Sequence, residues 1–208
     1  MRRRLVTLVA IVCGFVPLLH AQALSRPSLI AALQRGGYII LMRHASSPDT
    51  RPTKETAAPG NTTLERQLDA NGRSTAAAMG KAFRDLRIPL GTIIISPAFR
   101  ARQTADLAGW TSAEAHPELG DNGQGMQQIV PEVQTSWLQE RVGEKPREGT
   151  NTLIITHSTN IAAAFPSAST DLAEGEAIIF RPGESSLTTV VVARVKIEEW
   201  PRLAASGR

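Results

Sequence analysis

The chain has 208 residues, of which 42% are hydrophobic and 20% are charged, a composition that excludes disorder throughout and is ordinary for a globular protein. Its 23 basic and 19 acidic residues give a net charge of +4, but three of the arginines lie within the first 23 residues. Without that segment 20 basic residues face 19 acidic ones, a charge of +1, so basicity is no evidence for a nucleic-acid partner.

Residues 1–23 have the layout of a secretory signal peptide. Three arginines follow the first methionine, an apolar run extends from Leu5 to Leu19, and Ala21 and Ala23 form a small-x-small cleavage site. The apolar run is shorter than the about 20 residues that a membrane-spanning helix needs. We therefore expect cleavage after Ala23, a mature domain over residues 24–208 that is periplasmic or secreted, and no stable membrane insertion. The only cysteine leaves with the signal, so the mature domain would have no disulfide.

The first half of the domain alternates helical and strand-like segments. Ser28–Arg35 is predicted to be a short helix that ends before two glycines, and Tyr38–Met42 is a continuous apolar run typical of a strand buried on both faces. A long loop is expected over residues 46–63, which are rich in proline, threonine and charge. The alanine-rich segment Asp69–Leu86 follows as a helix, with Asp69 or Asn71 as its N-cap.

The second half continues the alternation. Thr92–Ile95 is predicted to be a strand and Phe99–Ala108 a helix, and after a glycine-rich loop Ile129–Glu140 is predicted to be helical. Three further strands are expected at Thr152–Ile155, Glu176–Arg181 and Leu187–Val195, and the tail from Glu198 is expected to be frayed.

This alternation predicts one α/β domain, a three-layer sandwich in which a mostly parallel sheet is flanked by helices. Connections of this length are typical of right-handed helical crossovers. In such sheets ligands bind beyond the carboxyl ends of the strands, so the residues that follow each buried strand are the first place to look for chemistry.

Arginine and histidine side chains follow three of the predicted strands. Arg43 and His44 come directly after the first apolar run, Arg100 follows the second strand at the start of a helix, and His157 follows the third. Two histidines and two arginines delivered to one edge of a sheet indicate an anion-binding or catalytic site. An unrelated polar rim is the alternative interpretation of the same pattern.

Four motifs resemble those of the histidine phosphatase superfamily, which has the phosphoglycerate mutase-like fold. LMRHASS around His44 resembles the family's opening Arg-His-Gly, with Ala45 in place of glycine. SPAFRARQTA around Arg100 is similar to its Ser-Pro-x-x-Arg-Ala-x-Gln-Thr motif, which is the most specific of the four. LIITHS resembles its third motif, a strand that ends in histidine, and LDANGRSTAAAMG its Leu-x-x-x-Gly-x-x-x-Ala helix.

The resemblance implies a role for each residue of this group. His44 would be the nucleophile that takes the phosphoryl group on a ring nitrogen, and nearby guanidinium groups would keep it unprotonated by lowering its pKa. Arg43 and Arg100 would clamp the phosphate, because arginine donates bidentately and stays charged. His157 would donate to a phosphoryl oxygen, and the amide of Ser158 would add a further donor. No metal or other cofactor is implied.

The proton donor for the leaving group is less clearly marked in the sequence. The family places an acid between its second and third motifs, often as Leu-x-Glu, and the segment here reads Pro-Glu-Leu-Gly-Asp. If Leu119 is the motif leucine, Asp121 stands at the acid position. Glu118 is the second candidate, and two ordinary loop acids are the third interpretation.

The function that follows is a secreted, metal-independent phosphomonoesterase that works through a phosphohistidine. In layout, with a signal peptide, a short RHA-type core and a compact C-terminus, the chain resembles periplasmic heptose phosphatases of the lipopolysaccharide core. A sugar phosphate or a lipopolysaccharide core phosphate is therefore the expected substrate, so the partner is a phosphorylated small molecule or glycan and not nucleic acid. The alternative is a non-catalytic module of the same fold that binds phosphorylated ligands. Four further basic residues have two interpretations, contact with an anionic substrate or solvated surface charge, and we favour surface charge: Arg51, Lys54, Arg66 and Arg73.

Overall fold

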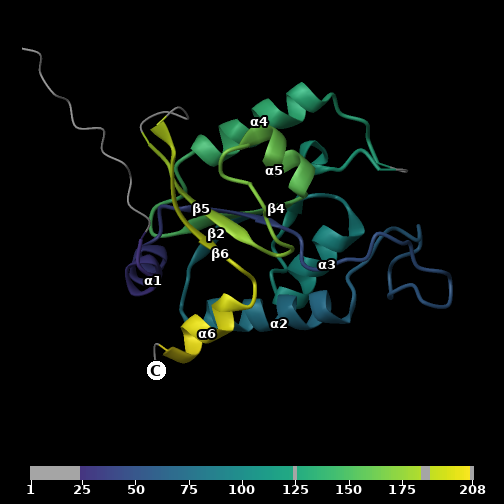
Figure 1. The fold of residues 1–208 in the computed structure, drawn as a ribbon, viewed down its shortest axis with the longest axis horizontal. Helices are drawn as coiled ribbons and strands as arrows, with labels where there is room; N and C mark the ends of the chain where they lie inside the picture. Colours follow the sequence, from purple (N-terminus) through teal and green to yellow (C-terminus); the bar gives the residue numbers. More distant parts are fainter. Residues whose placement is uncertain (1–23, 124–125, 184–187, 207–208) are drawn as a thin grey trace, which may run out of the picture.

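A computed structural model shows a sheet covered by helices on both faces (Figure 1). It describes residues 24–123, 126–183 and 188–206, so the predicted signal peptide at residues 1–23 lies outside the described residues. The described strands are β1 Ile39–Arg43, β2 Leu90–Ile95, β3 Glu114–Ala115, β4 Asn151–Thr156, β5 Ala177–Arg181 and β6 Val190–Val195. The described α-helices are α1 Arg26–Arg35, α2 Ala70–Asp85, α3 Phe99–Ala108, α4 Pro131–Gly143, α5 Ser158–Ala164 and α6 Glu199–Ser206, and a short 3₁₀ helix, η1, covers Pro117–Leu119.

The sheet has the strand order β3-β2-β4-β1-β5-β6. The strands β3, β2, β4 and β1 pair in parallel, whereas β5 runs antiparallel to both β1 and β6. The expected α/β sandwich with a mostly parallel sheet is therefore confirmed, and β5 is its one reversed strand among the described residues. Because β1 and β4 are parallel neighbours, the residues that follow them leave the sheet at the same edge.

The central strands are buried on both faces, which explains why their sequences are continuous apolar runs. In β1, Ile40 and Met42 contact the larger core, which is covered by α1, α2, α3 and α6. Ile39 and Leu41 contact the smaller core under α4 and α5 on the opposite face. The alternation of side chains along β1 thus joins two cores through one rigid sheet.

The C-terminal segment differs from the prediction. Residues from Glu198 were expected to fray, but Glu199–Ser206 form α6, which packs on α2. Trp200 is fully buried there, with its ring centroid 4.6 Å from that of Phe83. Burial of an indole of this size contributes about 3–5 kcal/mol to stability by comparison with truncation to alanine. The segment is too short to show a periodicity from which this anchor could be recognised.

The loop after β1 is fastened to the start of α2. Asp69 is the N-cap of α2, and its side chain accepts the amide of Gly72 at 2.6 Å and the hydroxyl of Ser46 at 2.7 Å. A side chain at position 72 would place its Cβ 2.1 Å from the carbonyl oxygen of Ser46, so the close approach requires glycine. This contact fixes the backbone two residues after His44.

No helix within the described ranges has the length and apolar character needed to cross a membrane.

Candidate active site

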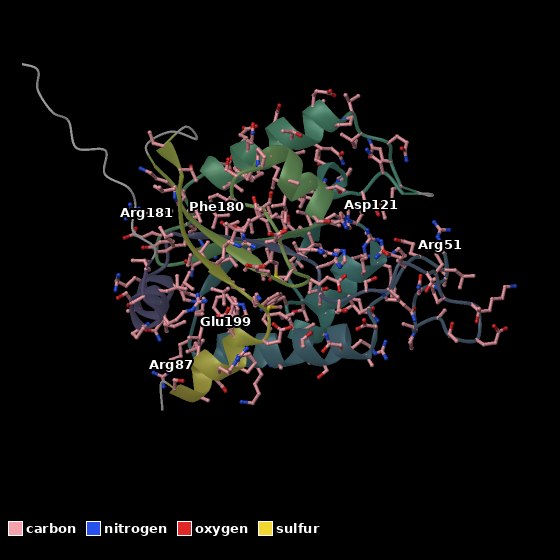
Figure 2. The ribbon with its side chains drawn as sticks, viewed as in Figure 1. Arg51, Arg87, Asp121, Phe180, Arg181 and Glu199 are labelled. Atoms are coloured by element: carbon pink, nitrogen blue, oxygen red, sulfur yellow. The ribbon has the colours of Figure 1, made fainter. Side chains whose placement is uncertain are left out.

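The residues predicted from the strand ends converge at one end of the sheet. Arg43 is in register with Thr156 across the β1–β4 pair, so His44 and His157 follow the two strands side by side. Their ring centroids are 5.3 Å apart, and both side chains are buried. In Figure 2, Asp121 and Arg181 lie on opposite sides of the molecule.

The Arg100 guanidinium joins these side chains. It is 4% exposed and extends from the first turn of α3. Its Nε donates to Nε2 of His44 at 3.0 Å, and its Nη2 donates to Nδ1 of His157 at 2.9 Å. The same Nη2 contacts Oδ2 of Asp121 at 2.5 Å. One buried cation thus has three acceptors, all of them predicted site residues.

The hydrogen bonds also define which nitrogen of each ring carries the proton. Arginine can only donate, so Nε2 of His44 and Nδ1 of His157 must present lone pairs. Nδ1–H of His44 donates to the carbonyl of Ala45 at 2.8 Å. Nε2–H of His157 donates to the Ser96 hydroxyl at 2.8 Å. The lone pair of His44 therefore lies on Nε2, where it accepts Nε–H of Arg100.

Both histidines are held in the neutral form. Burial lowers the pKa of His44 to about 3; the bond to Ala45 opposes this change, and the charges of Arg100, Arg43 and Arg66 add to it. Burial and the charge of Arg100 likewise hold the pKa of His157 well below its ordinary value. A nucleophilic nitrogen must be unprotonated, and His44 meets this requirement throughout the neutral pH range.

Asp121, and not Glu118, contacts the histidine–arginine group. Burial raises the pKa of Asp121, but the hydrogen bond and charge of Arg100 outweigh burial and hold it below its ordinary value. In the free protein Asp121 is therefore an ionised partner of Arg100. Glu118 makes no hydrogen bond to His44, Arg100 or His157 within the described ranges, and its buried Oε2 has no partner there.

Arg43 is oriented by a partner that the sequence analysis did not identify. Its Nη2 lies 3.1 Å from Oε1 of Glu174, and its Nη1 donates to the carbonyl of Leu172 at 3.3 Å. Its Nε is buried and has no partner within the described part of the chain. The guanidinium is thus held at its two outer nitrogens, which leaves Nε as a donor without an acceptor.

The loop that carries Glu174 is held in place by hydrogen bonds of the Glu176 side chain. Glu176 is 4% exposed; its Oε2 accepts the amide of Ala173 at 2.9 Å, and its Oε1 accepts Nε of Arg194 at 2.8 Å. Arg194 also donates to the carbonyl of Thr170 at 2.7 Å. In turn the amide of Gly175 donates to the carbonyl of His44 at 2.9 Å. The loop between α5 and β5 therefore contacts both Arg43 and His44.

Two further residues support the site without having been assigned a role from the sequence. Ser96 follows β2 directly and orients His157 through the hydrogen bond described above. Thr104 lies one turn after Arg100, and its hydroxyl donates to the Arg100 carbonyl at 2.8 Å and accepts the amide of Ala45 at 3.2 Å. The position of Ser96 at a strand end, in the Ser-Pro of the second motif, was the signal that could have identified it.

The remaining expectations have mixed outcomes. Ser158 is the first residue of α5, directly after His157, so its amide has no acceptor within the helix; its role as a donor to substrate stays a prediction. Arg66 departs from the surface-charge interpretation. Its side chain donates to the carbonyls of Pro48 and Ser47 at 2.8 and 3.2 Å, and its charge lowers the pKa of both site histidines.

Within the described ranges no group of three or more His, Cys, Asp or Glu side chains is arranged to hold a metal ion.

Comparison with known families agrees with this geometry. The family model described as "Histidine phosphatase superfamily (branch 1)" matches residues 39–146, more than half of the chain. The chain belongs to the histidine phosphatase superfamily, branch 1. This family match supports a phosphatase activity in general for the chain. No curated protein sequence matches it.

Solved structures share the fold. The protein histidine phosphatase SixA in complex with tungstate is 17% identical, with 78% of this chain and 98% of that chain covered and a TM-score of 0.56. A mutant phosphoserine phosphatase from Entamoeba histolytica in complex with phosphoserine is 12% identical, with 77% and 98% covered and a TM-score of 0.50. At these identities the likeness establishes the fold, and the expected phosphoglycerate mutase-like architecture is confirmed.

The lowered histidine pKa values predict a pH-dependent stability. Both rings are neutral in the folded protein but have a pKa of about 6.5 when unfolded, so the unfolded chain binds more protons below that pH. The free energy of unfolding should therefore fall as the pH decreases from 7 to 5, by up to about 1.4 kcal/mol per pH unit for each histidine. Urea unfolding of wild type and His44→Ala at several pH values measures this slope. The slope should be about half as steep in the variant, and equal slopes would contradict the assignment.

The contact between Arg43 and Glu174 gives a second prediction. Glu174→Gln removes the charged partner that orients the guanidinium, so we expect the KM for an aryl phosphate to rise about 3- to 10-fold, with a smaller change in kcat. Steady-state kinetics separates the two constants. Glu198→Gln, at an exposed position just before α6, is the matched control and should change neither. A lower KM in Glu174→Gln would show instead that the carboxylate competes with phosphate.

Proposed function

We propose that the protein is a metal-independent phosphomonoesterase that forms a phosphohistidine on His44. The observation that carries this proposal is the contact between Nε of Arg100 and the unprotonated Nε2 of His44 at 3.0 Å. A phosphoryl group that is bound by Arg100 and takes the place of this contact would have its phosphorus next to the lone pair of Nε2 of His44. In this arrangement the positive charge that phosphoryl transfer needs comes from arginine.

The first chemical step forms a bond from Nε2 of His44 to phosphorus and breaks the bond from phosphorus to the ester oxygen. Arg100 and Arg43 stabilise the charge on the transferring oxygens. The ester oxygen leaves with its electron pair and takes a proton from Asp121. In the second step water attacks phosphorus, Asp121 accepts a proton from that water, and His44 is released.

Asp121 must be protonated to act as the acid, although Arg100 keeps it ionised in the free protein. Substrate binding reverses the sign of the local charge. The phosphate dianion pairs with the Arg100 guanidinium and brings negative charge close to the carboxylate, and both changes raise the pKa of Asp121.

The second candidate function, a module that binds phosphorylated ligands without turnover, is less well supported. A binding module has no need for a histidine whose buried ring is tautomerically fixed and aimed at the anion site. Both functions need Arg43 and Arg100, so turnover of a simple aryl phosphate and covalent phosphorylation of His44 are what separate them.

Substrate and location rest on the sequence. We propose export through the signal peptide at residues 1–23 and action on a sugar phosphate or a lipopolysaccharide core phosphate in the periplasm or outside the cell. The supporting observations are the arginine-rich start, the apolar run and the small residues before Leu24, together with the resemblance in layout to periplasmic heptose phosphatases.

The proposed mechanism predicts a trapped intermediate. The chain from Leu24 onwards should hydrolyse p-nitrophenyl phosphate in the presence of EDTA, and rapid quenching should give an acid-labile, base-stable phosphoenzyme labelled on His44. His44→Ala should lose turnover and label, while Arg43→Ala and Arg100→Ala should reduce turnover severely. Label on a serine, or activity that EDTA abolishes and a divalent ion restores, would overturn the mechanism.

The role of Asp121 predicts a dependence on the leaving group. Asp121→Asn should slow the hydrolysis of alkyl phosphates by about 10²- to 10⁴-fold, because their leaving oxygens need a proton. Hydrolysis of p-nitrophenyl phosphate should change much less, since nitrophenolate leaves without one. Glu118→Gln serves as the control and should affect both substrates little. Equal losses on both substrates in Asp121→Asn, or a selective loss in Glu118→Gln, would remove Asp121 from this role.

A further inference from the structure

A pocket of about 240 Å³ lies beside Asp121. Its walls come from the loop after η1, from the first turns of α4 and from α5, which lie on the same face of the sheet (Figure 1). The lining residues are Gly120, Asp121, Asn122, Pro131, Gln134, Thr135, Thr159, Asn160 and Ala163. We call this the polar pocket.

The position of the polar pocket suits a leaving group. In phosphoryl transfer the attacking and leaving atoms lie roughly in line on opposite sides of phosphorus. If His44 attacks and Asp121 protonates the leaving oxygen, the leaving group extends past Asp121. Asp121 contacts Arg100 and also lines the polar pocket, and α5, which forms another part of the wall, begins directly after His157.

The chemistry of the lining limits what the pocket can hold. None of the described residues that line it is a lysine or an arginine, and its one charged side chain is the carboxylate of Asp121. A leaving group with its own negative charge would find no counter-ion there. Five of the nine lining residues carry an amide or a hydroxyl, and the exposed wall between these groups is largely apolar.

The amides of the pocket are fixed in place before any ligand binds. The side chains of Gln134 and Asn160, each 8% exposed, donate to the carbonyl of Gly120 at 2.8 and 3.0 Å. Oε1 of Gln134 accepts Nδ2 of Asn122 at 3.3 Å. These bonds hold the loop that carries Asp121 against α4 and α5, so the wall is preorganised.

Two hydroxyls remain for a ligand. The Thr159 hydroxyl donates to Oδ1 of Asn160 at 3.2 Å and keeps its lone pairs, and the Thr135 hydroxyl has no partner among the described residues. At about 240 Å³ the pocket is smaller than the about 300–1,000 Å³ of pockets that hold drug-sized ligands, so it suits a group of about one ring.

We propose that the polar pocket binds the leaving group of the substrate and selects a neutral, hydroxyl-rich group of about one sugar ring. This inference rests on the proposed phosphatase function and adds to it the place and chemistry of substrate selection. Sugar hydroxyls both donate and accept hydrogen bonds, so they can pair with the fixed amides and the threonine hydroxyls of the pocket. Pro131 and Ala163 can contact the C–H faces of a sugar ring.

The test places a large side chain in the polar pocket and leaves His44, Arg43, Arg100, His157 and Asp121 unchanged. Ala163 lines the pocket and is exposed, so Ala163→Trp should block it, while Ala162→Trp places the same ring at the adjacent exposed position of α5, outside the lining. Substrates are a panel of hexose monophosphates, 3-phosphoglycerate as an ester with an anionic leaving group, a phosphoserine peptide and acetyl phosphate, whose leaving group is small. Inhibition by vanadate reports on the phosphate site alone.

In wild type we expect the highest kcat/KM for hexose monophosphates among the esters with large leaving groups. Ala163→Trp should reduce that kcat/KM at least 10-fold, while acetyl phosphate hydrolysis and vanadate inhibition change less than 3-fold. Ala162→Trp should leave all of them unchanged. Thr135→Val and Thr159→Val, which remove one hydroxyl each at constant shape, should each reduce hexose phosphate kcat/KM about 3- to 10-fold.

Failure of this inference is distinguishable from failure of the phosphatase function. If Ala163→Trp loses vanadate inhibition and all activities, the tryptophan has distorted the phosphate site; the two threonine variants then decide, and unchanged kinetics in both would overturn the inference. A wild type that prefers 3-phosphoglycerate or the phosphoserine peptide would also overturn it. A wild type that hydrolyses none of the compounds, acetyl phosphate included, would instead refute the proposed phosphatase function.

Discussion

The site depends on a single buried guanidinium, that of Arg100. A charged group that is 4% exposed is costly unless its donors are matched by acceptors, and here those acceptors are His44, His157 and Asp121. Each of these contacts serves two purposes at once. It stabilises the cation in the folded protein, and it fixes the tautomer of a histidine or the ionisation of a carboxylate.

The fold places this guanidinium through three independent supports. Strands β1 and β4 deliver the two histidines to one sheet edge in parallel register, and β2 places Ser96 beside them. Helix α3 begins close to this edge, and its first N–H, that of Phe99, is accepted by Oε2 of Glu65 at 2.9 Å. The Thr104 hydroxyl then ties α3 to the backbone after His44. The arginine therefore has little freedom relative to the rings it touches.

The sequence was sufficient for the parts of the molecule that depend on local pattern. Buried strands such as Tyr38–Met42 are continuous apolar runs, and the residues after them could be placed at one edge because parallel strands end together. Contacts between segments far apart in the chain left no local pattern. Glu174 meets Arg43 across 131 positions, and Trp200 anchors a tail that has no periodicity of its own. Arg66 has the sequence context of a surface charge, and only the fold brings it near both histidines.

Each of the two arginines expected to bind phosphate is paired with a carboxylate in the free protein: Arg43 with Glu174 and Arg100 with Asp121. The Asp121 carboxylate offsets part of the Arg100 charge and so weakens the binding of any phosphate, whether ester or product, whereas Glu174 orients Arg43. A site whose arginines had no carboxylate partners would bind the inorganic phosphate product as tightly as the phosphate ester. Tight binding that is equal for substrate, transition state and product does not accelerate turnover. The carboxylates differ in one respect. Glu174 lies on a loop held by the Glu176–Arg194 pair and has only an orienting contact. Asp121 borders the polar pocket, and in the proposed mechanism it exchanges Arg100 for a proton when phosphate binds. The partner that gives up its arginine is thus the one placed to serve as the acid.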